Sequence, residues 1–249
     1  MGILDINLHQ DLIDKNQEYW KRKPLLRTLY GDFYRLIAKH LSGLSESKIV
    51  ELGSGLGNIH DVIPDCIRTD LFPNPWIDQI ENAYKLSFAD ESVSDLILTD
   101  VFHHLKYPGT ALNELHRVLR TGGKVIMLEP CLSALGLFVY GALHDEPIAV
   151  TKNIEWFAPE IWKPENIDFY AAQGNATRIF ITNKYRSNLR NWKKVETIRL
   201  SAIAYAASGG YSKPQLYPTA FLPFIKKLEK ILDLFPTLFA TRLLVILEK

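Results

Sequence analysis

Apolar residues recur at helical spacing near the start of the chain. Between residues 25 and 41, side chains three or four positions apart share one face, namely Leu26, Leu29, Tyr30, Phe33, Ile37 and Leu41. This spacing predicts an amphipathic helix that packs on the rest of the fold and ends near Gly43.

Short segments that predict strands follow, over residues 49–52, 66–70, 77–80, 94–100 and 124–129. Those at 94–100 and 124–129 have the apolar runs of buried strands. Residues 109–120 have the pattern of an amphipathic helix, and Thr121, Gly122 and Gly123 predict its C-cap and a turn. Strands that alternate with a helix predict a parallel sheet covered on both faces, with right-handed crossovers.

The pattern changes after Pro130. Residues 131–143 are apolar and small but too few to span a bilayer, and residues 156–185 are rich in aromatic side chains. A partly alternating strand is predicted over 194–204, a helix over 220–235 and a last strand over 242–248. We therefore predict four segments, which are an N-terminal helical segment (1–45), a core (46–130), a cap (131–193) and the C-terminal part of the sheet (194–249).

Composition narrows the class of protein. The chain has 249 residues, 47% of them hydrophobic, and a net charge of +1, which is typical of a globular protein and argues against a nucleic-acid binder. Cys66 and Cys131 are far apart and lack metal-ligand spacing, so no disulfide framework and no metal site is predicted. The first residues lack the apolar segment of a signal peptide, and we expect a cytoplasmic location.

A glycine-rich turn follows the first predicted strand. Gly53, Gly55 and Gly57 alternate, whereas the dinucleotide fingerprint G-x-G-x-x-G needs a glycine at the sixth position, where Asn58 stands. Glu51 precedes the turn and would crowd a pyrophosphate, but it suits a ligand with a positive charge.

Several motifs in this order resemble the class I S-adenosylmethionine-dependent methyltransferases of the small-molecule type. They are VELGSGLG (50–57), TDLF (69–72), ENAYKLSF (81–88), LTDVFHHL (98–105) and LRTGGKVIMLEP (119–130). The resemblance implies a Rossmann-like, doubly wound α/β fold with a mostly parallel seven-stranded sheet and an antiparallel last strand. It also implies a helical and aromatic cap after the fifth strand, and S-adenosylmethionine as cofactor, leaving S-adenosylhomocysteine as product.

The resemblance also implies the cofactor contacts. The glycine turn with Ser54 would hold the methionine part, Glu51 would orient the turn or face the amine, and Asp70 with Leu71 would hold the ribose. The adenine and remaining methionine contacts would come from Asn82, Ala83, Asp100 and Val101. The sequence departs from the family where Asn82 replaces an aspartate, where Ser87 and Thr121 replace prolines, and where LFPNPW replaces a crossover helix.

Three histidines are candidates for a catalytic base. His103 and His104 follow the fourth predicted strand, where the methyl group is expected, although packing at a helix entry is the simpler interpretation. His144 lies in His144-Asp145-Glu146, which could supply a base or metal ligands, with a solvated turn as the alternative.

We therefore expect methyl transfer to an oxygen, nitrogen or carbon nucleophile of a small or medium organic acceptor. This acceptor could be linked to a lipid or to a sugar. The segment 132–143 could also contact a membrane surface, and no nucleic-acid partner is expected. A non-catalytic regulator that binds the same cofactor is the main alternative, and a nicotinamide-dependent oxidoreductase is a weaker one.

Overall fold

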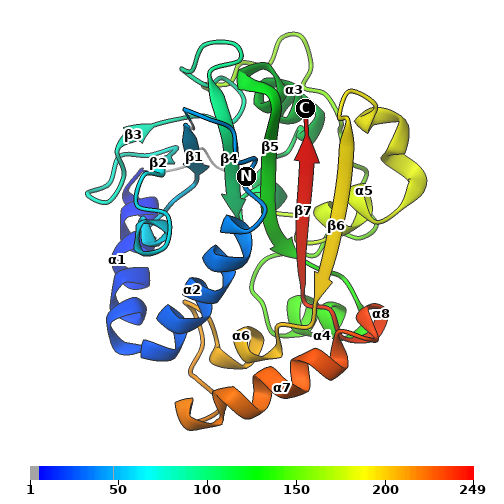
Figure 1. Ribbon diagram of the computed structural model, residues 1–249. Helices are drawn as coiled ribbons and strands as arrows, with labels where there is room; N and C mark the ends of the chain where they lie inside the picture. Colours follow the sequence, from blue (N-terminus) through cyan, green and yellow to red (C-terminus); the bar gives the residue numbers. More distant parts are fainter. Residues whose placement is uncertain (1–5, 47) are drawn as a thin grey trace.

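The computed structural model describes residues 6–46 and 48–249, and residues 1–5 of the predicted N-terminal segment lie outside these. A seven-stranded sheet with the order β3-β2-β1-β4-β5-β7-β6 forms the centre of the molecule (Figure 1). The strands are β1 (Ile49–Leu52), β2 (Ile67–Asp70), β3 (Gln79–Ile80), β4 (Val93–Thr99), β5 (Leu119–Pro130), β6 (Lys194–Leu200) and β7 (Arg242–Glu248).

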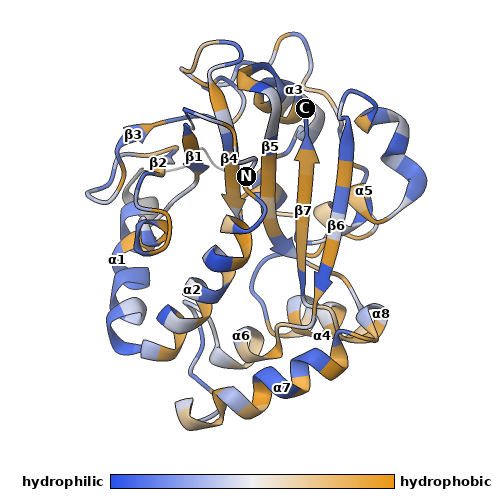
Figure 2. Ribbon diagram, viewed as in Figure 1, coloured by the Kyte–Doolittle hydropathy of each residue, from blue (hydrophilic) through white to orange (hydrophobic). Residues whose placement is uncertain are grey.

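The strand directions match the predicted sheet. β3, β2, β1, β4 and β5 pair in parallel, whereas β7 is antiparallel to both of its neighbours, β5 and β6. The Rossmann-like fold with a reversed last strand is thus confirmed. Figure 2 shows that β4, β5 and β7 are hydrophobic along most of their length, as expected for strands covered on both faces.

Eight α-helices of the described residues surround this sheet. They are α1 (Ile6–Arg22), α2 (Pro24–Ala38), α3 (Pro108–Val118), α4 (Ala134–Ala142), α5 (Asn175–Phe180), α6 (Ile203–Ser208), α7 (Leu222–Leu232) and α8 (Pro236–Phe239). Four 3₁₀ helices connect them, η1 (Asn58–Asp61), η2 (Phe102–His104), η3 (Asn183–Leu189) and η4 (Thr219–Phe221). The sequence pattern missed α1, in which polar residues outnumber apolar ones.

Alternate residues of each strand feed two separate cores. Val50, Leu96 and Val125 belong to one core, which also holds residues of α3, α5 and η3. Ile49, Ile97 and Ile126 point the other way and pack with residues of α2. The period of two along each strand therefore places helices on both faces of the sheet.

The structure corrects one local prediction. Gly122 and Gly123 do not cap α3, because that helix ends at Val118 with Leu119 as its C-cap residue. Both glycines lie within β5, where the pairing with β4 shifts register between Val93 and Asp95. Gly122 has a φ of +78°, so the glycine pair forms an irregularity inside a long strand rather than a turn before it.

The segment predicted as a cap packs directly on the sheet. Tyr185, Leu189 and Trp192 are buried in the same core as Val125 and Met127 of β5. An irregular stretch, residues 143–174, links α4 to α5. Figure 1 shows α4, α6, α7 and α8 gathered beyond the end of the sheet toward which β4 and β5 run.

Candidate active site

A cavity of about 1020 Å³ opens at the carboxyl ends of β1 and β4. Its floor is formed by Glu51, Gly53, Ser54, Gly55 and Asp100. Its walls come from α1, α2, α4 and α6 and from residues 209–216. Ligands of open α/β sheets bind at this edge, so the position itself indicates a functional site.

The glycine turn has two parts with different roles. Gly53 has a φ of +71°, and a Cβ there would lie 2.5 Å from Cγ2 of Val101, so packing requires glycine. Gly55 also has a positive φ and lines the cavity, and among the described residues a Cβ there would meet only Ile13, at 3.9 Å. Gly55 therefore leaves room for a ligand.

Asp70 braces this turn from the end of β2. Its Oδ2 accepts a hydrogen bond from the Gly55 amide at 2.9 Å, and its Oδ1 accepts one from the Leu71 amide at 2.7 Å. The carboxylate thus joins the ends of β1 and β2, where the resemblance places the ribose.

Glu51 is a buried acid at the floor of the cavity. Glu51 is only 1% exposed, and its Oε2 has no hydrogen-bond partner among the described residues. Burial raises the pKa of this carboxyl to about 7, although the hydroxyls of Ser54 and Tyr34 act in the opposite direction. A cationic ligand group beside Oε2 would supply the missing partner.

Asp100 forms a bidentate ion pair with Arg242. The two guanidinium nitrogens lie 2.5 and 2.6 Å from the two carboxylate oxygens, and Arg242 is only 1% exposed. The guanidinium also lies over the rings of Phe33 and Tyr205. Asp100 has a φ of +58°, a conformation that aspartate tolerates better than most residues, so the pair holds it in a strained position.

His103 is buried between two acids. Glu129 accepts hydrogen bonds from the amides of Val101 and Phe102 through Oε1, and its Oε2 lies 2.7 Å from His103 Nδ1. Burial opposes a charged imidazole, but Glu129 and Glu146 outweigh it and raise the pKa of His103 to about 10. A histidine that retains its proton is a poor general base.

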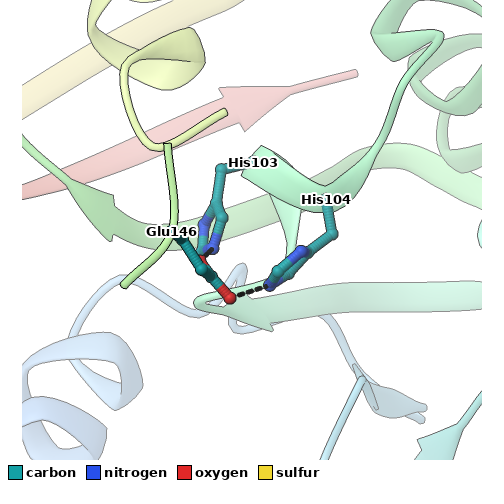
Figure 3. Close-up of side chains that lie close together, drawn as sticks. All are labelled: His103, His104 and Glu146. Carbon is teal, nitrogen blue, oxygen red and sulfur yellow. Dashed lines mark ion pairs between the residues drawn. The ribbon is translucent and has the colours of Figure 1, made fainter. Parts of the chain in front are cut away.

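His104 and Glu146 lie beside His103 in the wall of the cavity (Figure 3). Nδ1 of His104 lies 2.9 Å from the carbonyl oxygen of Tyr170, which can only accept, so Nδ1 donates and, in the neutral imidazole, Nε2 is unprotonated. Burial and the neighbouring His103 lower the pKa of His104. Gln173 donates to Oε2 of Glu146, and despite the cost of burial the two histidines lower the pKa of Glu146 to about 2.

The other predicted residues lie apart from this wall or outside the cavity. His144 lines the cavity but is exposed, and its Nδ1 accepts from the Glu146 amide at 3.2 Å. The cavity lining does not include Gly57, Asp70, Leu71, Asn82, Ala83 or Val101. Both ends of the Asn82 amide have protein partners, since Nδ2 donates to Pro164 and Oδ1 accepts from Tyr84.

Sequence reasoning missed several cavity residues. Arg242 was assigned only to an apolar strand, although an arginine within RLLVILE is itself a signal of a buried ion pair. Tyr30 was assigned only to a packing face, and Tyr205, Tyr211 and Gln173 carried no motif. These residues meet the glycine turn only because α2, α6 and the segment before α5 converge on it.

Comparisons with known proteins agree with this architecture. Residues 50–127 match the model of a family described as "Methyltransferase domain". No curated protein sequence matches the chain. A SAM-dependent methyltransferase from Thermotoga maritima is similar in structure, with a TM-score of 0.53, 15% identity and coverage of 96% of this chain and 99% of that one. A SAM-dependent methyltransferase from Archaeoglobus fulgidus has a TM-score of 0.50, 11% identity and coverage of 90% and 94%.

At such low identity the two structures support the fold alone, and the family match adds the methyltransferase domain. The cavity fits the cofactor of that family, because Gly55 leaves a bare surface and Glu51 offers a buried oxygen without a partner. The sheet order and the family match together show a methyltransferase domain over residues 50–127, in a Rossmann-like methyltransferase fold.

Proposed function

We propose that the protein transfers a methyl group from S-adenosylmethionine to an oxygen, nitrogen or carbon nucleophile of an organic acceptor in the same cavity. The observation that carries this proposal is the extent of the cavity, which runs from the glycine turn to His103, His104 and Glu146. A cofactor-binding regulator would have no need of this second part, so the cavity favours an enzyme.

The residues of the first part are assigned to the cofactor. The cofactor supplies an activated methyl group, so the chain's own task is to align the acceptor and exclude water. Glu51, Gly53, Ser54 and Gly55 would hold the amino-acid end and Asp70 with Leu71 the ribose. Asp100 would lie beside the methionine part. The assignment of Asn82 and Ala83 to the adenine and of Val101 to the methionine part is supported by the family resemblance alone, because these residues lie outside the cavity lining.

His104 is the proposed acceptor-side residue. Among His103, His104 and His144, only His104 combines an unprotonated Nε2, a fixed ring and a place in the cavity wall. His103 is held in the protonated form by two acids, and His144 is exposed and bonded to its own turn.

A direct test measures binding and turnover separately. Calorimetry with S-adenosylmethionine and S-adenosylhomocysteine should register binding of both, and methyl-labelled cofactor should transfer label to at least one class of a broad acceptor panel. No binding of either compound, together with binding of a nicotinamide dinucleotide, would reject the assignment.

Gly55→Ala should lower the affinity for S-adenosylmethionine by about tenfold or more, because its Cβ would occupy the cavity. Ser54→Ala is a useful comparison, since it changes the same turn without adding volume. Calorimetric titration of both variants checks this, and equal affinities for Gly55→Ala and the unmodified protein would contradict the position given to the cofactor.

Glu51→Gln should stabilise the ligand-free protein at pH 8 and weaken its binding of S-adenosylmethionine. Because the pKa of Glu51 is raised in the folded protein, protonation of this carboxyl stabilises the folded state at low pH. This stabilisation is lost as the pH rises from about 4.5 through about 7. The amide cannot ionise, so the variant should gain about 1–3 kcal/mol at pH 8 and little at pH 5. Thermal unfolding of both proteins across this range measures the difference, and a difference independent of pH would contradict the origin proposed here.

An apolar acceptor that is presented at a membrane surface suits the far side of the cavity. Leu135, Phe138, Val139, Leu143 and Leu216 line the cavity there. Large apolar side chains are also exposed on α4, α7, α8 and the segments next to these helices, at Leu137, Phe138, Leu143, Leu216, Phe221, Phe224, Leu228, Ile231, Leu234, Phe235 and Leu238. In the described part of the chain no helix has the length and apolarity that a membrane span requires. We propose a lipid-linked acceptor, with contact at the membrane surface through α4 and α7.

Phe224→Ser with Ile231→Ser should reduce cosedimentation with phosphatidylcholine–phosphatidylglycerol vesicles several-fold, because both side chains lie exposed on α7. Ile161→Ser is the matched control, since Ile161 is 92% exposed but belongs to the segment between α4 and α5. No retention of the unmodified protein, or equal losses in both variants, would reject this surface.

A further inference from the structure

We propose that His103, His104 and Glu146 bind one divalent transition-metal ion of the Zn²⁺ type. The role of the ion rests on the proposed function: the ion would hold an oxygen atom of the methyl acceptor. The binding itself is argued from the geometry of these three side chains.

The distances within this cluster are those of ligands rather than of hydrogen bonds. Nε2 of His103 and Nε2 of His104 lie 3.4 and 3.8 Å from the two oxygens of Glu146, and ligand atoms of all three residues lie within 4.8 Å of one another. Two ligands at about 2.0–2.1 Å from a tetrahedral zinc are about 3.4 Å apart, whereas a hydrogen bond would be about 2.8 Å long. Figure 3 shows Glu146 beside both rings, with a carboxylate oxygen directed toward His104.

Both rings are fixed through the nitrogen that would not bind the ion. Nδ1 of His103 lies 2.7 Å from Glu129, and Nδ1 of His104 lies 2.9 Å from the carbonyl oxygen of Tyr170. Histidines that bind metals almost always donate their other N–H to a carboxylate or a carbonyl, which orients the ring. Here that arrangement occurs twice and turns both Nε2 atoms toward Glu146.

The third ligand is oriented in the same way. Gln173 is buried and donates to Oε2 of Glu146, while its own Oε1 has no hydrogen-bond partner in residues 6–46 and 48–249. Glu129 and Glu146 bring two carboxylates to a poorly hydrated place. A divalent cation that displaced the Nε2 proton of His103 to solvent would balance both charges, with both histidines bound in their neutral form.

The nature and number of the ligands indicate the ion. Two imidazoles and one carboxylate favour zinc or a related transition metal over Mg²⁺ or Ca²⁺, which prefer oxygen ligands. All three residues line the cavity, so a further coordination position would face the acceptor space. Three protein ligands with an open position are typical of catalytic rather than structural zinc sites.

Sequence spacing could not predict this site. His103 and His104 follow β4, whereas Glu146 comes after α4 and Gln173 immediately before α5. These segments meet only in the folded chain. The spacing of the two cysteines, from which no metal site was predicted, gives no information about histidine and glutamate ligands.

The test uses the full chain, stripped with a chelator and then titrated with ZnCl₂ and, separately, CoCl₂. We expect about one ion per chain by elemental analysis and the visible spectrum of low-symmetry Co²⁺ with nitrogen and oxygen ligands. Glu146→Gln and His104→Gln should weaken binding at least about 100-fold, and Glu129→Gln about 10–100-fold. His60→Gln, at an exposed histidine in η1, is the control and should bind as the unmodified chain does.

Circular dichroism on every variant separates loss of the ligand from loss of the fold. Stoichiometric binding that disappears in Glu146→Gln while the fold persists would support the site. Failure of the unmodified chain to bind either ion, or equal affinity in Glu146→Gln and His60→Gln, would overturn it. Binding of S-adenosylmethionine measured on the same samples tests the proposed function independently of the ion.

Discussion

Asp100→Asn is expected to lower the free energy of unfolding by about 3 kcal/mol, because it leaves a buried guanidinium without its charge partner. Arg242 is almost wholly buried, and the only carboxylate with which it forms an ion pair in the described residues is Asp100. Asparagine tolerates the positive φ of this position, so the substitution changes the charge and leaves the backbone conformation accessible. Denaturant unfolding of the two proteins measures the effect.

The double variant Asp100→Asn/Arg242→Met provides the control. Removal of both charges should restore part of the lost stability, because an apolar side chain no longer needs a buried partner. If Asp100→Asn costs less than about 1 kcal/mol, or if the two single effects simply add, the pair does not stabilise the fold as argued.

His104→Ala is expected to lower kcat for methyl transfer by about 10²–10⁴-fold while S-adenosylmethionine still binds with nearly unchanged affinity. The imidazole lies in the acceptor-side wall, and its Nε2 faces Glu146 rather than the glycine turn. The expectation holds whether this nitrogen accepts a proton or binds an ion. Steady-state kinetics with the acceptor found in the panel, combined with calorimetry, separates the two quantities.

His116→Ala provides the matched control, since His116 belongs to α3 and lies against Asn191, away from the cavity. It should keep the activity of the unmodified protein. His144→Ala should have a smaller effect than His104→Ala, because His144 is exposed. Equal losses in His104→Ala and His116→Ala would show that the imidazole of His104 has no direct part in the reaction.

The fold could be predicted from the sequence because strands such as β1, β4 and β7 are largely apolar segments with clear ends. The last strand matches its predicted bounds, and β1 does so as well. Each lies between positions where the pattern breaks, and burial on both faces leaves little else that such a run can form.

The prediction weakened where tertiary contacts decide the structure. Gly122 and Gly123 have turn chemistry, yet pairing with β4 keeps them inside β5. The role of Arg242 depends on Asp100, which lies 142 positions earlier in the chain. Likewise, the local sequence does not indicate that Glu129 will bind His103, because β5 and η2 become neighbours only in the folded sheet.

The reversed direction of β7 has a consequence for the order in which the site is completed. Because β7 runs against its neighbours, its first residue, Arg242, lies at the same rim as the ends of β4 and β5. During synthesis, Asp100 therefore has no countercharge until the chain has been extended through Arg242, 142 residues later. A nascent chain that already has the glycine turn and the first five strands would still lack a charge-balanced cavity floor, so ligand binding should begin only after the final strand has inserted.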